Sequence, residues 1–194
     1  MRNLISIIAI LLIIAGTAAA ADYWHLSLGI RGSLVFPGER YSNAVGIGAM
    51  ASFGDPESKF STQLEFDNWK TTYDYKGSDP QFIGREFRYS GLGFGAFEKY
   101  RFFNQSSRYS PYAICGLGAY FLELKREEIV EIVGVQLMSK YIHSLFSGSA
   151  GLGVEANLSA RITTFIEGRY VTFFKNNNED NDLIQTYIGA RYHF

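Results

Sequence analysis

The last twelve residues of the chain, Leu183 to Phe194, alternate between apolar and polar side chains with a period of two. This period is typical of a β-strand whose two faces meet different surroundings. Termini of soluble domains usually fray, whereas the closing strand of a barrel in lipid needs an apolar outer face and an aromatic rim. The apolar face of this segment ends in two aromatic rings and consists of Ile184, Thr186, Ile188, Ala190, Tyr192 and Phe194.

The first residues follow the three-part plan of a secretory signal peptide. A short positive start, Met1 to Asn3, precedes a nearly unbroken apolar run from Leu4 to Ile14 and then a stretch of small residues. The apolar run is too short for a spanning helix, which needs about 20 residues. We therefore expect residues 1–21 to be a cleaved signal peptide, with an uncleaved anchor as the alternative. The small residues around the expected cleavage point are Ala19, Ala20 and Ala21.

Composition restricts how residues 22–194, which we expect to form one domain, can cross a membrane. No apolar run in this part is long enough for a spanning helix, so a spanning structure must be a closed barrel that pairs every backbone group. The chain has 20 glycines, 13 tyrosines and 16 phenylalanines but only 4 prolines, which favours strands. The formal net charge of −1 predicts no nucleic-acid partner. Cys115 stands alone, which excludes an internal disulfide.

Segments with the same alternation recur along the chain and predict about eight strands, an even number and the smallest that bacterial barrels use. Each is long enough to cross at a tilt, which takes about 9–11 residues. The expected fold is therefore all-β, an eight-stranded antiparallel up-and-down transmembrane β-barrel. The expected strands are 23–35, 44–53, 59–69, 87–100, 111–124, 146–157, 161–173 and 183–194.

Connection lengths give a second reason to expect a barrel, because outer-membrane barrels have short periplasmic turns and longer outer loops. The expected connections alternate between long and short along the chain. With the mature N-terminus in the periplasm, the long ones (36–43, 70–85, 125–145 and 175–182) face outward and the short ones (54–58, 103–110 and 157–159) face the periplasm.

Two features of this reading stay open. In the strand over 111–124, either the odd-numbered residues from Ala113 to Phe121 face outward, or Tyr112, Ile114, Tyr120 and Leu122 do. The first register is preferred, because it places Gly116 and Gly118 inside, next to the glycines of the preceding strand. The residues at 125–145 form either a hairpin above the membrane or a short helix.

The inward face of the expected barrel carries many polar residues. An eight-stranded barrel has room inside for side chains only, and buried charges persist when they are paired. We expect a lumen charge network of Arg31, Glu65, Glu155, Glu167, Arg169 and Arg191, together with Gln63, Asp67, Arg161 and Gln185. Such a network serves either as a plug of ion pairs or as a narrow, gated ion path.

Several segments resemble small outer-membrane barrels of the OmpA/OmpX type. These are Pro111-Tyr112 with Gly116–Tyr120, Gly151–Glu155 and Phe165–Tyr170. In that family a final Phe, preceded by apolar residues at alternate positions, is recognised by the barrel assembly machinery. The resemblance implies this role for Ile188, Ala190, Tyr192 and Phe194. It further implies residence in the cell outer membrane, contact with membrane lipid and lipopolysaccharide, a structural or surface-interaction role with little or no open pore, and no cofactor.

Two other functions have to be weighed against a structural or surface role. Some small barrels modify lipid A, and a serine hydrolase needs a nucleophile, a His and an acid within reach. Here His25 and His193 lie at strand ends expected in the periplasm, and Leu145 stands where the lipid A 3-O-deacylase family has its Ser after His143. We expect no enzyme and no metal site. The second alternative is a soluble, exported, lipocalin-like ligand-binding barrel.

The expected outer loops carry aromatic and basic residues. Such loops can contact an extracellular ligand, although an interfacial belt of Tyr is the alternative explanation. The residues are Tyr73, Tyr75, Lys76, Phe82, Arg85 and Tyr141. The expected oligomeric state is a monomer.

Overall fold

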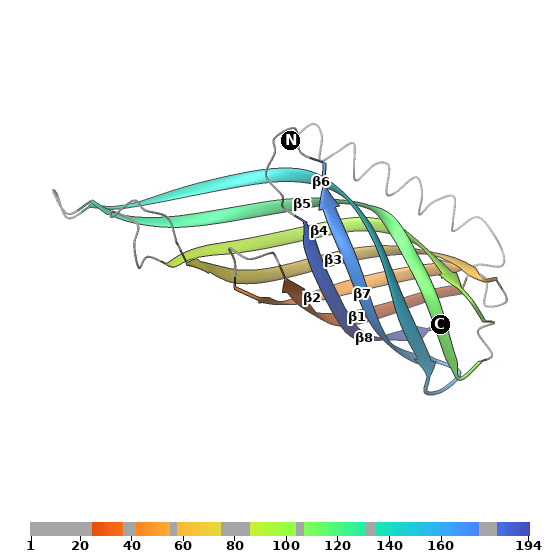
Figure 1. Ribbon diagram of the computed structural model, residues 1–194. Helices are drawn as coiled ribbons and strands as arrows, with labels where there is room; N and C mark the ends of the chain where they lie inside the picture. The colour runs from red at the N-terminus through yellow and green to blue at the C-terminus, as the bar shows by residue number, and fades with distance from the viewer. Residues whose placement is uncertain are drawn as a thin grey trace.

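Eight antiparallel strands follow one another around a closed barrel in the order β1 to β8 (Figure 1). The computed structural model describes residues 25–36, 42–54, 58–74, 86–103, 107–130, 135–174 and 182–194. The predicted fold class is confirmed, and the expected signal peptide lies outside the described residues. The strands are β1 (His25–Phe36), β2 (Ala44–Gly54), β3 (Phe60–Asp74), β4 (Glu86–Arg101), β5 (Tyr109–Val130), β6 (Val135–Asn157), β7 (Ile162–Phe173) and β8 (Leu183–His193).

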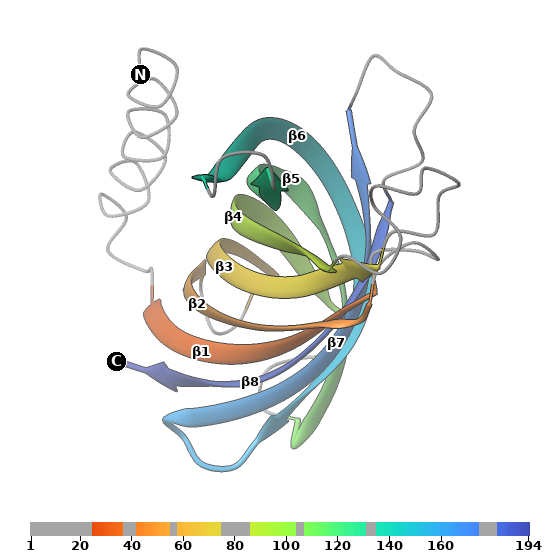
Figure 2. The ribbon, with the colours of Figure 1, turned by 90° about the vertical axis from the view of Figure 1, so that its left-hand side faces the viewer.

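The first and last strands close the barrel. The β1–β8 ladder runs from Ser27 opposite His193 to Phe36 opposite Ile184, and Figure 2 shows the strands wrapped around a common axis. Closure removes the open sheet edges that lipid cannot hydrogen-bond. Within the described residues, no helix is long and apolar enough to cross a membrane.

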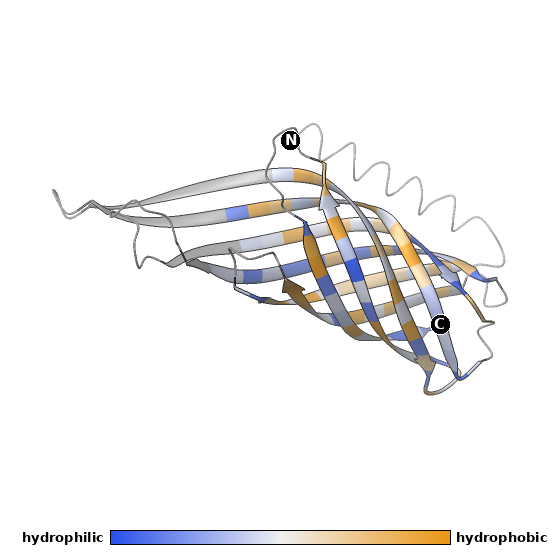
Figure 3. Ribbon diagram, in the orientation of Figure 1, coloured by the Kyte–Doolittle hydropathy of each residue, from blue (hydrophilic) through white to orange (hydrophobic). Residues whose placement is uncertain are grey.

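The apolar face of each strand points away from the barrel axis. Leu28, Ile47, Ile166 and Ile188 are 47%, 72%, 56% and 67% exposed. Hydrophobic and hydrophilic residues alternate along the strands in Figure 3. A water-soluble barrel of the lipocalin type would hide such residues, so this arrangement removes the basis for that alternative.

The open register of β5 is resolved in favour of the preferred alternative. Tyr112, Ile114, Tyr120 and Leu122 are buried inside, while Leu117 is 66% exposed. The free Cys115 shares its outward face. Aromatic rings can point inward here because the neighbouring strand β4 supplies glycines opposite them. A Cβ on Gly93 would lie 2.7 Å from the Tyr120 ring.

The segment 125–145 forms a hairpin, as the first of its two alternatives predicted. β5 continues to Val130 and β6 begins at Val135, with residue pairs up to Val130 opposite Val135. The prediction that this segment is the longest connection was wrong, because most of its residues belong to the two strands. The hairpin extends well beyond the neighbouring strands in Figure 1.

The two ends of the barrel differ, and each is named here by its connections. The loop end holds the connections 37–43, 75–85, 131–134 and 174–182. The turn end holds the connections 55–59, 102–108 and 158–161 together with the C-terminal residue. We use these two names below.

Candidate functional site: the charged lumen

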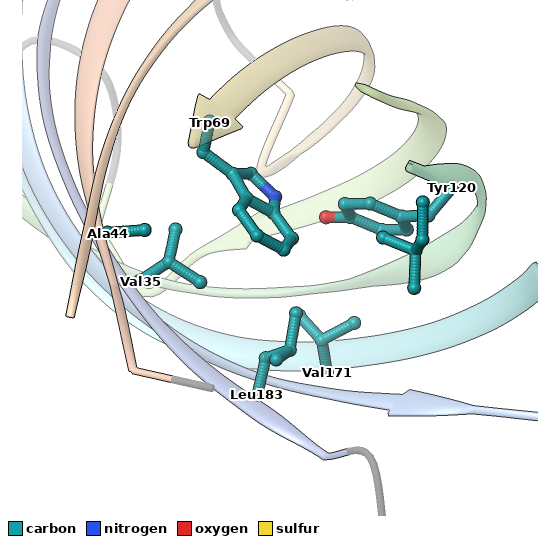
Figure 4. Packing of buried hydrophobic residues seen from close by; sticks show 7 residues of the cluster. Val35, Ala44, Trp69, Tyr120, Val171 and Leu183 are labelled. Carbon is teal, nitrogen blue, oxygen red and sulfur yellow. The ribbon is translucent and has the colours of Figure 1, made fainter. Parts of the chain in front are cut away.

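An apolar plug fills the lumen at the loop end. In Figure 4, Trp69 and Tyr120 extend toward each other across the interior, with Val35 and Ala44 beside Trp69 and with Val171 and Leu183 below the two rings. Gly91 gives the indole room, since a Cβ there would lie 2.8 Å from Trp69 Nε1. The plug consists of Val35, Ala44, Trp69, Tyr120, Leu122, Val171 and Leu183, with Leu145 and Phe173 packed against it.

Below the plug lies the central cluster, formed by Arg31, Glu65, Asp67, Glu167 and Arg169. Arg31 Nη1 is 2.7 Å from Glu65 Oε2, and Arg31 Nε donates to Asp67 Oδ1 at 3.0 Å. Arg169 donates to both oxygens of Glu65, at 2.6 and 2.5 Å, and also pairs with Glu167. Each guanidinium therefore meets two carboxylates, and Glu65 joins the two halves of the cluster.

Neutral donors compensate for the surplus of carboxylates in the central cluster. Tyr112 Oη donates to Glu167 at 2.7 Å, and Gln63 Nε2 donates to Glu65 at 2.6 Å. The Arg31 guanidinium also lies 4.0 Å from the centre of the Tyr187 ring. Cation–π contacts and hydrogen bonds of this kind satisfy charges that have lost their water.

The turn-end cluster comprises Lys99 and Arg101 of β4, Glu155 of β6 and Arg191 of β8. Lys99 Nζ lies 3.0 Å from Glu155 Oε2, Arg101 Nε lies 2.7 Å from Glu155 Oε1, and Arg191 also pairs with Glu155. All four side chains are buried. One carboxylate thus serves three cations, the reverse of the balance in the central cluster.

Tyr112 separates the two clusters. Its hydroxyl belongs to the central cluster through Glu167, while Lys99 Nζ lies 5.1 Å from the centre of its ring on the other side. A chain of hydrogen bonds also links the clusters: Arg191 donates to Ser52 at 3.3 Å, and Ser52 donates to Gln63 at 3.2 Å.

The structure places every residue of the expected lumen charge network inside the barrel and in an ion pair. Gln63, Asp67 and Gln185 are also buried. The prediction was wrong for Arg161, which is exposed at the turn end and donates to Tyr192 Oη at 3.1 Å. Arg161 precedes β7 rather than starting it, so the alternation of that strand does not apply to it.

Lys99 and Arg101 are the lumen charges that sequence reasoning missed. Both have odd numbers, like Gly91, Gly93 and Gly95 of the same strand, which were expected to face inward. Continuing that alternation to the end of the strand would have found them. The expected strand stopped at residue 100, one residue before β4 ends.

The four residues of the expected assembly signal lie on the last strand and at the chain end. Ile188 and Phe194 are 67% and 69% exposed, and the rings of Tyr192 and Phe194 meet edge to face with centroids 5.2 Å apart. Ile188 belongs to the apolar surface in the middle of β8, while Tyr192 and Phe194 add to that surface at the turn end. Their recognition by the assembly machinery stays a prediction.

The residues considered for catalysis are not assembled into a triad by the described contacts. Ser147 is buried and Ser144 is exposed, and the side chain of His143 lies outside the described residues. His193 Nε2 is 2.9 Å from Thr163 Oγ1, whose own proton goes to Asn157 Oδ1, so the imidazole donates in this contact. Among the described residues, no group of three or more His, Cys, Asp or Glu is placed to hold a metal ion.

Eight strands with an apolar exterior around a lumen of paired charges define a transmembrane β-barrel of the outer-membrane class. The family comparison gives the same answer. Residues 6–194 match the model of the outer membrane protein beta-barrel domain, and the chain belongs to this family. No curated protein matches the chain.

Solved outer-membrane proteins share the fold at low sequence identity. Neisserial surface protein A is 13% identical, with a TM-score of 0.57 over 89% of this chain and 98% of that one. Ail of Yersinia pestis, solved with the heparin analogue sucrose octasulfate, is 16% identical, with a TM-score of 0.53 over 88% and 97%. At these identities the likenesses concern the fold alone.

An enzyme has a similar fold as well. The outer membrane enzyme PagL is 8% identical, with a TM-score of 0.52 over 84% of this chain and 97% of that one. At this identity the likeness concerns the fold alone, so catalysis has to be judged from the residues of the chain itself.

Proposed function

We propose that the protein is a surface-interaction barrel of the outer membrane, non-enzymatic and with little or no open pore. The observation that carries this proposal is the β5–β6 hairpin. The ladder between β6 and β7 begins only at Ser147 opposite Phe173, although β6 itself begins at Val135. Among the described residues, 135–145 therefore pair with β5 alone, while the carbonyl oxygen of Phe146 accepts from the backbone N–H of Phe174 at 2.9 Å.

An unpaired strand edge presents a row of backbone donors and acceptors. Such edges bind other chains by adding a strand, or bind polar ligands. The hairpin projects from the loop end. We place this end outside the cell because it carries the hairpin and the two longest connections, 75–85 and 174–182. A barrel whose only role was to occupy lipid would gain nothing from two strands of 22 and 23 residues.

Three basic residues occupy opposed positions in the register of neighbouring strands at the base of this hairpin. Lys125 of β5 stands directly opposite Arg88 of β4 on one side and Lys140 of β6 on the other. Directly opposed residues share a face of the sheet. Three cations in a row at the outer end favour an anionic partner, and we propose the phosphate groups of lipopolysaccharide.

The filled lumen supports a closed pore. The plug of Trp69 and Tyr120 covers the loop end, and below it the central cluster fills the cross-section with paired charges. The signal peptide at 1–21 and assembly recognition of Phe194 complete the proposal, with lipid, lipopolysaccharide and the assembly machinery as partners. We further propose that the barrel acts as a monomer.

The test of the lipopolysaccharide contact is a thermal unfolding series on refolded protein in nanodiscs. Anything that binds only the folded state raises the unfolding midpoint. We expect lipopolysaccharide to raise the midpoint of the wild type and not that of the double variant Lys125→Gln/Lys140→Gln. An unchanged wild-type midpoint would overturn the proposed contact.

A matched control removes two positive charges from the opposite end. Lys59 and Arg108 are exposed at the turn end, so Lys59→Gln/Arg108→Gln should keep the full rise in midpoint. Equal losses in both double variants would show that overall charge, rather than the row on the hairpin, governs the effect. Sucrose octasulfate, which Ail binds, is a second anionic probe for the same variants.

Planar-bilayer recording tests the closed pore. The wild type should give few or no resolved conductance steps, because an apolar plug blocks hydrated ions. Trp69→Ala, which removes the largest side chain of the plug, should increase their frequency. Frequent steps in the wild type would contradict a closed lumen. A lipid A-modifying enzyme would instead show a change in lipid A that His143→Ala abolishes.

A further inference from the structure

A groove of about 930 Å³ lies on the outer wall of the barrel where β8 meets β1, and we call it the seam groove. Its sides are isoleucines that are among the most exposed apolar side chains of the wall. Its floor is low because small residues lie between them, and a Cβ on Gly32 would meet only the carbonyl oxygen of Gly46, at 4.0 Å. The lining residues used below are Ile30, Gly32, Ile47, Ala49, Ile188 and Ala190.

The strand register makes the groove continuous across the seam. Ala190 of β8 stands opposite Ile30 of β1. One outward position nearer the loop end, Gly32 of β1 stands between Ile188 of β8 and Ile47 of β2. Directly opposed residues share a face of the sheet, so these positions form one concave apolar surface on the outside of the barrel.

A basic side chain lies beyond the turn-end limit of the groove. Tyr192 is the next outward residue of β8 after Ala190, and its hydroxyl accepts a hydrogen bond from Arg161 Nη1 at 3.1 Å. Both side chains are exposed. Within the part of the chain that the structure describes, no carboxylate forms an ion pair with Arg161. Tyr192 thus holds the guanidinium beside the wall, and the other N–H donors of Arg161 stay available for an anion.

An apolar groove that ends at a cation matches the two parts of a phospholipid. The acyl chain is apolar, and the phosphodiester is an anion that guanidinium groups bind well. Ala190 and Tyr192 are two residues apart, which is about 7 Å along a strand. A lipid whose acyl chain lies in the groove can therefore bring its phosphate to Arg161.

We propose that the seam groove and Arg161 together bind one anionic glycerophospholipid, with an acyl chain in the groove and the phosphodiester on the guanidinium. A headgroup without an ammonium fits best, because no described carboxylate pairs with Arg161 and could receive one. The site lies at the opposite end of the wall from the proposed lipopolysaccharide contact. It extends the proposed function to the periplasmic leaflet, and either contact can fail without the other.

The experiment locates a labelled lipid on refolded protein in an uncharged detergent by solution NMR. Phosphatidylglycerol that carries a nitroxide on one acyl chain is added stepwise, and the loss of backbone amide signals is followed. We expect the signals of Gly32 and Ala49 to be lost with saturation, well before that of Leu117 on β5. Equal loss at all three positions, or loss without saturation, would show ordinary partitioning into the micelle and overturn the proposal. A protein dimer that the lipid disperses would assign the groove to a second copy instead.

The first variant fills the groove from its floor. Gly32→Leu places a side chain where the backbone leaves room, so the barrel should fold normally. Excluding one methylene of the acyl chain weakens binding about fourfold, so the half-saturating lipid concentration should rise by about this factor or more. Gly168→Leu is the control, since Gly168 lies outside the seam groove and a Cβ there meets nothing within 4 Å. Equal effects of both substitutions would refute a specific groove.

The second variant removes the charge. Arg161→Gln should raise the half-saturating concentration of phosphatidylglycerol about fivefold, the contribution of one basic residue at an anionic membrane surface. Arg108→Gln removes another exposed charge at the turn end, outside the groove, and should leave that concentration unchanged. Labelled phosphatidylcholine should respond less to Arg161→Gln. Equal effects of the two arginine substitutions would reduce the observation to general electrostatics and refute the site.

Discussion

The central cluster and the turn-end cluster both hold buried charges, but with opposite ratios of carboxylates to basic groups. In the central cluster, Arg31 and Arg169 each meet two carboxylates, and Glu65 is shared between them. In the turn-end cluster, Lys99, Arg101 and Arg191 share the single carboxylate of Glu155. The two imbalances have opposite sign, so the third carboxylate of the central cluster offsets part of the positive excess at Glu155.

The largest expected effect is a difference in stability loss between two variants, each of which neutralises the carboxylate at the centre of one cluster. Glu155→Gln leaves three buried cations without a full counter-charge and should lower the free energy of unfolding by about 3–5 kcal/mol. Glu65→Gln should cost about 1–3 kcal/mol, because Arg31 keeps Asp67 and Arg169 keeps Glu167. Urea unfolding of refolded protein in detergent measures both.

The same pair of variants can break the comparison. A larger loss from Glu65→Gln than from Glu155→Gln would mean that the central cluster, not the turn-end cluster, is the one short of compensation.

The second prediction concerns the space that Tyr112 needs between the clusters. A Cβ on Gly153 would lie 2.5 Å from Tyr112 Oη and 2.8 Å from the carbonyl oxygen of Ile166. Gly153→Ala should therefore destabilise the barrel by about 1–3 kcal/mol through overpacking. Gly168→Ala is the control, since a Cβ there meets nothing within 4 Å, and it should be neutral or stabilising by about 0.4–1 kcal/mol. Equal midpoints in urea would refute the crowding at Gly153.

A smaller effect is expected when Tyr112 loses only its hydroxyl. Tyr112→Phe keeps the ring between the clusters but removes the 2.7 Å donor to Glu167, so the loss should be about 1–2 kcal/mol. Tyr192→Phe removes a hydroxyl that accepts from the exposed Arg161, and it should change stability by less than about 0.5 kcal/mol. Similar losses in both variants would mean that burial of the hydroxyl does not matter here.

The smallest predicted effect belongs to the hydrogen-bonded link between the clusters. Ser52 accepts from Arg191 and donates to Gln63, so Ser52→Ala breaks both steps. We expect a loss of about 0.5–1.5 kcal/mol. In a double-mutant cycle with Glu65→Gln the losses should not add, because Gln63 also donates to Glu65. Strict additivity would show that the clusters are independent.

Much of the candidate site could be predicted because a strand has only two faces. The parity of Arg31, Glu65 and Glu155 within their apolar alternation was enough to place each of them inside. The same rule failed at Arg161, which lies before β7, and it was not carried far enough along β4 to reach Lys99 and Arg101. Both errors lie near strand ends. At Arg161 the turn rather than the alternation decides the direction of the side chain, whereas Lys99 and Arg101 follow the alternation of β4 to its last residue.

The sequence by itself determined the class of fold, the number of strands and the face of most residues within the strands, because period-two alternation and the chemistry of lipid leave few alternatives. Only the tertiary structure decided which charges meet. The partners Arg169 and Glu65 are 104 residues apart, and their contact depends on how strands β3 and β7 face each other across the lumen. The surplus of basic side chains at Glu155 arises in the same way, since charge balance across a closed barrel is a property of the assembled wall rather than of any one strand.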